Sequence, residues 1–178
     1  MPLPIDKELF HWVVAVSNQP GLEWLAFLFW IITVSVIAVI LAALYYYWRV
    51  ARDRKFTALL ALGGIATYAI TAAVKWLAQR PRPHMVDMLS FPSRHASLAF
   101  LLATLIGAYL LASKPKKYDF RILGAALFFI WAILVGFSRL WLEEHWMTDV
   151  IGGAVLGIIV GILFWKCKNK IYKNLNWL

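Results

Sequence analysis

The sequence predicts an all-α integral membrane protein: a helical bundle of about five transmembrane helices, plus one N-terminal interfacial helix. Two observations predict this fold class. The 178 residues are 62% hydrophobic, have a mean hydropathy of +0.71 and include nine carboxylates, whereas a water-soluble globule needs a far more polar surface. Long apolar stretches also follow one another along the chain, and about 20 apolar residues cross the hydrocarbon core of a bilayer.

The apolar stretches account for most of the chain. We expect transmembrane helices at residues 22–48, 56–78, 96–112, 121–137 and 150–165, the last being the shortest. No stretch remains for a soluble domain, so residues 1–178 are expected to form a single membrane-embedded domain. The lone Cys167 excludes an intrachain disulfide.

The N-terminal segment, residues 1–21, is too short and too charged to be another span. Charged and polar side chains interrupt the apolar positions of residues 5–16, and they are Asp6, Lys7, Glu8 and His11. This pattern favours an amphipathic helix on the membrane interface that ends at the turn of residues 18–21. A frayed tail is the alternative.

Twelve of the 18 lysines and arginines fall in three short segments that alternate with the predicted spans. Five crossings with the N-terminus outside put all three segments on one side, and the positive-inside rule makes that side cytoplasmic. We therefore expect a multi-pass protein of the cell (plasma or inner) membrane with a cytoplasmic C-terminus and no nucleic-acid partner. The twelve are Arg49, Arg52, Arg54, Lys55, Lys114, Lys116, Lys117, Arg121, Lys166, Lys168, Lys170 and Lys173.

Five other basic residues lie on the outer side, against that rule. Positive charge on the unfavoured side needs a reason, and binding an anion is the simplest one. These residues are Lys75, Arg80, Arg82, Arg94 and Arg139.

The first outer segment runs from Lys75 to Pro83. Its two prolines cannot continue a helix, so the second span ends near Ala78 or Gln79. Lys75 then lies one turn inside that end, and Arg82 projects from the stiff segment after it. A lysine point charge and a planar arginine fork together suit a phosphate. A snorkelling cluster at the interface is the alternative.

The second outer segment is Phe91-Pro92-Ser93-Arg94-His95. Proline followed by a hydroxyl residue is typical of a helix N-terminus. The unpaired backbone N–H groups of such a terminus bind oxyanions, Ser93 adds a hydroxyl, and His95 is placed to transfer a proton. Alone the motif is weak, because an interfacial histidine can simply be solvated.

The third outer segment contains Ser138-Arg139, His145 and Asp149. His145 and Asp149 are four residues apart, so the carboxylate can accept the imidazole N–H and leave the other ring nitrogen as a nucleophile. Three small residues continue the spacing of four, which indicates close packing against another helix or, alternatively, dimerisation. They are Gly153, Gly157 and Gly161.

In this order and spacing, the three segments resemble the three-part signature of the type 2 phosphatidic acid phosphatase superfamily. These integral-membrane lipid phosphatases share their site with vanadium haloperoxidases. The resemblance covers Lys75 to Asp149. It implies a phosphatase with no metal and no cofactor, acting on a membrane lipid phosphate. The family often has six spans, and here the helix at residues 5–16 replaces the first.

The resemblance also implies a role for each residue of the site. His145, oriented by Asp149, attacks phosphorus and forms a phosphohistidine, and His95 protonates the leaving oxygen. Glycine usually stands where this chain has Arg94, which we interpret as a specificity element. Glu143 and Glu144 are either interface residues or partners of the site arginines, and His11 and His84 are bystanders. The phosphate-binding residues are Lys75, Arg82, Ser93, Arg94 and Arg139.

The expected substrate is a lipid phosphate whose tail stays in the bilayer, since the site faces the outer interface. A polyprenyl diphosphate, similar to undecaprenyl diphosphate, fits best. Phosphatidylglycerol phosphate or phosphatidate is the alternative substrate. A non-enzymatic membrane protein that binds anionic lipid is the alternative class, although it does not need the histidine–aspartate pair. The sequence leaves the oligomeric state undecided, and a homodimer is one possibility.

Overall fold

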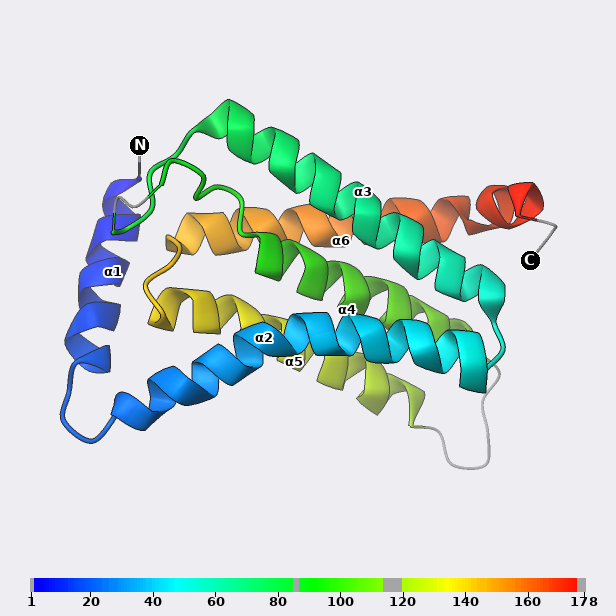
Figure 1. Ribbon diagram of the computed structural model, residues 1–178, viewed down its shortest axis with the longest axis horizontal. Coiled ribbons are helices and arrows are strands. Elements are labelled where there is room, and N and C mark those ends of the chain that lie inside the picture. The colour runs from blue at the N-terminus through cyan, green and yellow to red at the C-terminus, as the bar shows by residue number, and fades with distance from the viewer. Residues whose placement is uncertain (1, 85–86, 114–119, 176–178) are drawn as a thin grey trace.

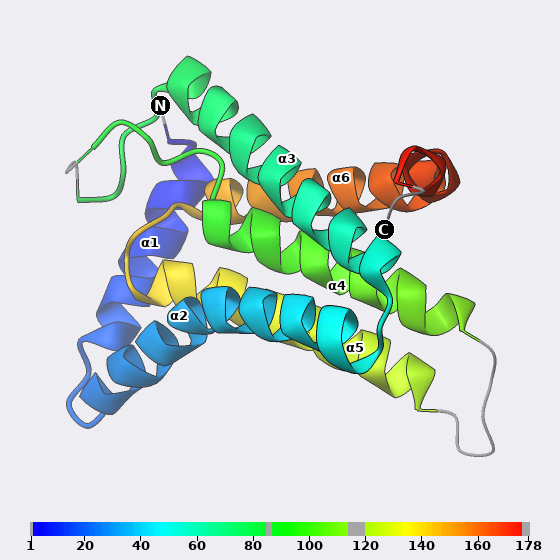
Figure 2. The ribbon, with the colours of Figure 1, turned by 45° about the vertical axis from the view of Figure 1, so that its right-hand side comes forward.

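In the computed structural model, which describes residues 2–84, 87–113 and 120–175, five long helices run alongside one another and helix α1 lies across one end of them (Figures 1 and 2). All five are long and apolar enough to cross a membrane, and the described residues contain no strand. The predicted fold class is therefore confirmed. The helices are α1 (Pro4–Ser17), α2 (Glu23–Tyr45, continued by the π-helical turn Tyr46–Val50), α3 (Arg54–Ala78), α4 (Arg94–Ala112), α5 (Arg121–Trp141) and α6 (Met147–Asn174).

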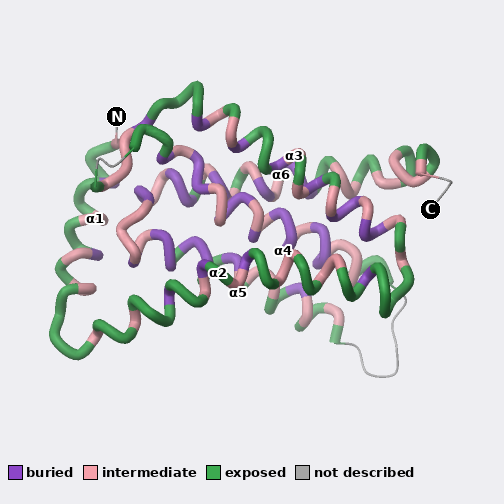
Figure 3. Tube along the Cα trace, in the orientation of Figure 1, coloured by how far each residue is buried: buried purple, intermediate pink, exposed green. Residues whose placement is uncertain are grey.

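Helix α4 is the centre of the bundle. It packs against α5 and α6 along most of its length, and the buried residues concentrate on it and on the faces turned toward it (Figure 3). Leu101 and Leu105 of α4 meet Phe56 and Leu59 of α3 in the main apolar cluster. Large apolar side chains on the outer faces, such as Leu77, are exposed, as expected of a surface that contacts lipid.

The glycine stripe of α6 packs against α4 within the same chain. A Cβ on Gly153 would lie 2.5 Å from the carbonyl oxygen of Ser93, and one on Gly157 would meet the carbonyl oxygen of Ser97. Only glycine allows this approach, which brings the beginnings of the two helices together. Since α4 occupies the stripe, it is not the dimerisation surface that the sequence left open.

The structure differs from the sequence-based expectations in the length of α6 and in the burial of one residue of α1. Helix α6 reaches Asn174 and so carries the C-terminal lysines on its last turns, well past the expected end at residue 165. In α1, Asp6 is 1% exposed, although the sequence pattern made it one of the polar residues on the surface of an amphipathic helix. The physical reason is a set of partners from distant segments, described below.

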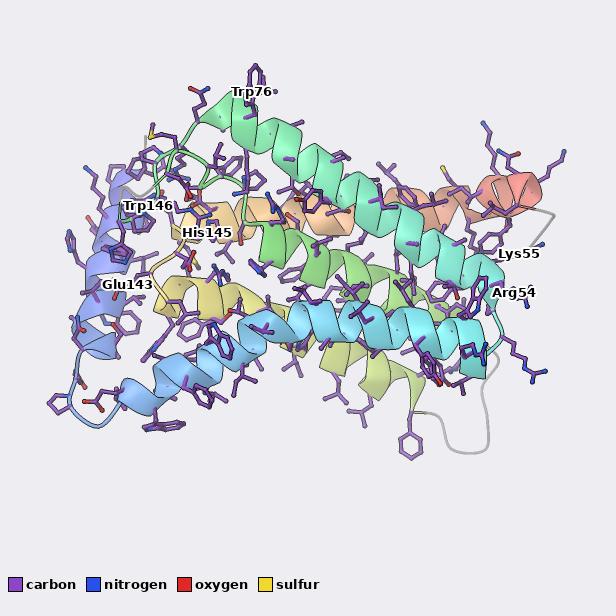
Figure 4. The ribbon with its side chains drawn as sticks, in the orientation of Figure 1. Arg54, Lys55, Trp76, Glu143, His145 and Trp146 are labelled. Carbon is purple, nitrogen blue, oxygen red and sulfur yellow. The ribbon has the colours of Figure 1, made fainter. Side chains whose placement is uncertain are left out.

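The described basic residues of the three predicted cytoplasmic segments lie at the end of the bundle away from the candidate site. Arg54 and Lys55 lie at the end opposite His145 and Glu143 (Figure 4). The lysines at the end of α6 and Arg121 at the start of α5 are at the same end as Arg54 (Figure 1). The described members of the three predicted cytoplasmic segments thus share one end. Lys114, Lys116 and Lys117 lie outside the described residues.

Candidate active site

His145 and Asp149 form a buried pair at the beginning of α6. The imidazole Nδ1 lies 3.5 Å from Asp149 Oδ2, and neither side chain is more than 3% exposed. Asp149 Oδ2 also accepts hydrogen bonds from the backbone N–H of Trp146, at 2.9 Å, and from the hydroxyl of Ser90. His145 precedes the helix, which begins at Met147, and does not lie on its face. The carboxylate orients the ring with Nδ1 toward Asp149, which leaves Nε2 as the nitrogen able to attack.

Burial also controls the protonation of His145. Removal from water lowers its pKa to about 4, against the opposing effect of the hydrogen bond that the imidazole donates to Asp149. The imidazole is therefore neutral at pH 7. A neutral imidazole is the form that a nucleophilic mechanism requires.

Lys75 ties the end of α3 to the loop before α4. Its ammonium group is buried and donates hydrogen bonds to the carbonyl oxygens of Leu89 and Ser90, the latter at 3.0 Å. These two residues lie just before Phe91-Pro92-Ser93, the segment that leads into α4. A buried cation is therefore held next to the N-terminus of α4.

Arg82 and Arg139 converge on one carboxylate. Arg82 Nη1 lies 2.7 Å and Arg139 Nη2 3.0 Å from the same oxygen, Oε2 of Glu144. Arg82 also pairs with Asp87 at 2.9 Å, and Arg139 Nη1 donates to the hydroxyl of Thr33 at 3.2 Å. Glu144 is thus a partner of the site arginines. Two guanidinium groups that donate to one anionic oxygen form the arrangement that binds a phosphoryl oxygen.

Ser93 is the N-cap of α4 and is fully buried. Its backbone N–H donates to the carbonyl oxygen of Asp149 at 2.9 Å, which joins the starts of α4 and α6. Its hydroxyl has no hydrogen-bond partner among the described residues. Half-buried His95 follows in the first turn. A buried hydroxyl next to a helix N-terminus supplies donors for an oxyanion.

Arg94 stacks on an aromatic ring of α3. Its guanidinium group lies over the ring of Tyr68 on α3, 4.5 Å from the ring centroid, with Nη1 3.4 Å from the phenol oxygen. Tyr68 also lines an apolar groove of about 490 Å³ between α2, α3 and α4, whose other walls include Leu44, Gly64 and Leu98. Arg94 therefore stands where the groove meets the site.

Sequence reasoning missed three residues that hold Asp149 in place. Arg80 Nη1 lies 2.7 Å from Asp149 Oδ1, and Arg80 Nη2 lies 2.5 Å from the carboxylate of Asp6. Ser90 is the third. Arg80 had a signal, because it is one of the outer basic residues, but Asp6 lies 74 positions away from it. His84 pairs with Glu143 at 3.0 Å on a largely exposed face, which agrees with its interpretation as a bystander.

The fold and the site together define a class. A buried histidine–carboxylate pair beside converging cations, at one end of a bundle of five long apolar helices, has the chemistry expected of a site for a phosphate group at a membrane. The chain belongs to the PAP2 superfamily, whose model matches residues 56–173. The family predicted from the three outer segments is therefore confirmed.

Relatives in this superfamily carry different lipid names. The chain is 30% identical over 139 residues to undecaprenyl-diphosphatase BcrC of Bacillus subtilis, covering 72% of this chain and 66% of that protein. It is 34% identical over 107 residues to phosphatidylglycerophosphatase B of the same organism, covering 54% and 50%. The chain thus aligns with about two thirds of one of these relatives and half of the other.

Two solved structures share the fold. The crystal structure of a PAP2-type phosphatidylglycerolphosphate phosphatase from Bacillus subtilis superposes with a TM-score of 0.73 at 26% identity, over 94% of this chain and 86% of that one. Aquifex aeolicus LpxE superposes with a TM-score of 0.71 at 23% identity, over 92% and 96%. Both matches extend over more than nine tenths of this chain, which supports the fold described above.

Proposed function

We propose that the chain is a metal-independent lipid phosphatase that hydrolyses a polyprenyl diphosphate, similar to undecaprenyl diphosphate, to the monophosphate and inorganic phosphate. The observation that carries the proposal is the buried His145–Asp149 pair beside two arginines that hold one anionic oxygen between them. Membership of the PAP2 superfamily and the name of the relative BcrC support it.

In the first step, the terminal phosphoryl group takes the place of the Glu144 carboxylate between Arg82 and Arg139. Glu144 is 46% exposed and is free to move outward. His145 Nε2 attacks phosphorus, and the bond from phosphorus to the bridging oxygen breaks. His95, which takes up a proton as the anionic substrate binds beside it, gives that proton to the bridging oxygen, so the lipid leaves as the monophosphate.

In the second step, water attacks the phosphohistidine. His95, now neutral, takes a proton from the water, and the bond between phosphorus and Nε2 breaks. Inorganic phosphate leaves, and His145 returns to its neutral form against Asp149. The charge that develops on the phosphoryl oxygens is offset by Lys75, Arg82, Arg139 and the hydroxyl of Ser93, and so the proposed reaction needs no divalent metal.

The apolar groove beside Tyr68 suits the tail of the substrate. It has a volume of about 490 Å³, it is lined almost entirely by apolar side chains of three helices, and Arg94 stands at the junction with the site. A lipid tail in this groove places its phosphate at the cations. This arrangement favours a lipid over a soluble sugar phosphate.

A lipid phosphate monoester is the second candidate substrate. The 34% identity to phosphatidylglycerophosphatase B favours phosphatidylglycerol phosphate, with phosphatidate as the related case. The chemistry at His145 would be the same, and only the leaving group would differ.

Phosphate release by detergent-purified protein tests the proposal. The substrates are a polyprenyl diphosphate, phosphatidylglycerol phosphate and phosphatidate, each with a chelator present. We expect the wild type to release phosphate from the diphosphate fastest. His145→Ala should lose the activity, whereas His84→Ala, which alters an exposed histidine, should keep it.

Each failure has a different meaning. Activity that needs magnesium would contradict the metal-free mechanism, and activity retained by folded His145→Ala would remove the nucleophile. Preference for a monoester would change the substrate. No release from any lipid by folded protein would favour a protein that only binds anionic lipid.

The site is proposed to face the outer side of the cell membrane, with the C-terminus in the cytoplasm. The test uses Cys167→Ser protein with a single new cysteine, either Met88→Cys near the site or Asn174→Cys at the other end. A membrane-impermeant thiol reagent added to intact cells should label only the first. Labelling of only the second would invert the topology.

A further inference from the structure

A buried chain of charges joins the N-terminal helix α1 to the proposed nucleophile. Asp6 pairs with Arg80 at 2.5 Å, Arg80 pairs with Asp149 at 2.7 Å, and Asp149 Oδ2 lies 3.5 Å from His145 Nδ1. None of the four side chains is more than 9% exposed. The chain of contacts begins on α1, the one described helix that is too short to be a candidate membrane span.

We propose that Asp6 is a positioning residue for the phosphatase reaction: it holds the Arg80 guanidinium in the orientation that leaves Asp149 Oδ2 to His145. This inference rests on the proposed function of the same site. In this proposal Asp6 contacts neither the substrate nor His145. Asp6 acts only through Arg80 and the start of α6.

The surroundings of Asp6 show that its carboxylate is buried, ionised and paired with Arg80 and Thr148. Its neighbours Lys7 and Glu8 are exposed, whereas Asp6 is fully buried, and a buried carboxylate is costly unless it is paired. Burial raises its pKa, but hydrogen bonds from Thr148, from the backbone of Leu3 and from Arg80 lower the pKa by more. The net pKa lies below the usual aspartate value, so Asp6 is ionised at neutral pH.

The fork of Arg80 explains how Asp6 reaches the nucleophile. One nitrogen, Nη2, is held by Asp6, so only Nη1 bonds to Asp149, and it does so at Oδ1. Without the charge of Asp6, both nitrogens of the fork can turn to Asp149, because arginine remains charged when buried. Arg80 would then compete with the His145 N–H for the second oxygen.

Thr148 provides a second link between Asp6 and the site. Asp6 Oδ1 accepts the backbone N–H of Thr148 and its hydroxyl, both at 3.0 Å. Thr148 directly precedes Asp149 in the first turn of α6. Phe10 of α1 also packs against Trp146, with ring centroids 5.4 Å apart. Helix α1 is therefore placed against the segment that carries His145 and Asp149.

Asp6→Asn tests the proposal because asparagine keeps the shape and an acceptor for Thr148 but removes the charge that holds Arg80. Glu8→Gln is the matched control, an exposed acid neutralised on the same helix. With full-length protein and a polyprenyl diphosphate, we expect Asp6→Asn to lower kcat about 10- to 100-fold with KM nearly unchanged. Glu8→Gln should match the wild type, and Asp6→Glu should recover part of kcat.

A double variant separates action through Arg80 from a general loss of structure. If Asp6 acts through Arg80, Asp6→Asn combined with Arg80→Gln should be no slower than Arg80→Gln alone. Multiplied losses would contradict the proposed route. Asp6→Asn with the same kcat as Glu8→Gln, or with a loss that only follows the amount of folded protein, would overturn the proposal.

A spectroscopic readout keeps the test independent of turnover. In protein labelled with ¹⁵N-histidine, His145 should show one tautomer, protonated at Nδ1, and Asp6→Asn should mix the two tautomers. His145→Ala assigns the signal. If the wild type releases no phosphate but Asp6→Asn changes the tautomer, the proposed function fails and the positioning role stands. An unchanged tautomer overturns the role.

Discussion

The two ends of the bundle are both rich in positive charge, but the basic side chains are exposed at one end and buried at the other. At the end that holds the last turns of α6, Lys166, Lys170 and Lys173 are exposed. At the site end, Lys75 and Arg139 are buried and bonded to oxygen atoms. The comparison teaches that the distribution of basic residues along the sequence indicates only how the chain is oriented in the membrane. Basic side chains that are buried and converge on one partner indicate a binding or catalytic site.

The largest effect that sharpens this comparison is the loss of a buried cation. Arg139→Ala should lower kcat/KM about 10²- to 10³-fold, since it removes a donor aimed at the phosphoryl oxygens. Lys170→Ala, at the other end, should leave the rate unchanged. Steady-state phosphate release checks both variants. Equal effects at the two ends would mean that charge acts through the membrane surface and not through a site.

A second prediction concerns the spacing of the helices at the site end. Gly153→Ala places a methyl group against the Ser93 carbonyl oxygen, so α4 and α6 must separate. We expect a loss of about 1–3 kcal/mol in stability and a fall in activity of at least tenfold. Gly107→Ala, where the added atom meets Ala125 and Phe129 at an ordinary contact distance of 3.6 Å, is the control. Thermal unfolding in detergent and phosphate release measure the two effects.

A third prediction uses the pH dependence of stability. The pKa of His145 is lowered by burial to about 4 in the folded protein, against about 6.5 in an unfolded chain. Below pH 6.5, His145 takes up a proton in the unfolded chain but stays neutral in the folded protein. The free energy of unfolding therefore decreases as the pH is lowered, by up to roughly 1.4 kcal/mol per pH unit. Above pH 6.5 this group contributes no slope.

Unfolding midpoints between pH 7 and 5 test this prediction. His145→Gln should reduce the dependence, and His84→Gln, at an exposed histidine, should leave it unchanged. A slope that survives His145→Gln unchanged would place the titrating groups elsewhere in the molecule.

The smallest expected effect concerns the specificity of the site end. Tyr68→Phe removes the phenol oxygen near Arg94 but keeps the ring beneath the guanidinium group. We expect a change of a few-fold in the ratio of diphosphate to monoester hydrolysis. Arg94→Gly, which restores the residue usual in the family, should change that ratio further in the same direction. An unchanged ratio in both variants would show that Arg94 has no part in substrate choice.

Much of the fold could be predicted because spans in a membrane must be long, apolar and helical. The spacing of four also predicted the His145–Asp149 contact, but His145 makes it from the segment before α6 and not from the face of the helix. Arg139 and Arg82 were predicted as ligands, but their shared partner Glu144 was left as one of two alternatives.

The rest depends on contacts that local patterns do not record. Asp6 and Arg80 meet only because α1 folds across the end of the bundle, and an acidic residue in an amphipathic pattern is ordinarily solvated. Ser90 carries no motif at all. Arg94 was expected among the phosphate ligands, and its stacking on Tyr68 follows from the packing of α3 against α4, which the sequence of α4 alone does not encode.

The position of Glu144 has a consequence for turnover. A carboxylate tethered beside Arg82 and Arg139 acts as a resident competitor, whose effective concentration is in the millimolar range or above for such a short connection. An incoming anion must displace Glu144, so its net binding free energy is the difference between its own interaction with the two arginines and that of Glu144. Product phosphate meets the same competitor as substrate, so the arrangement disfavours a site that stays blocked by its own product.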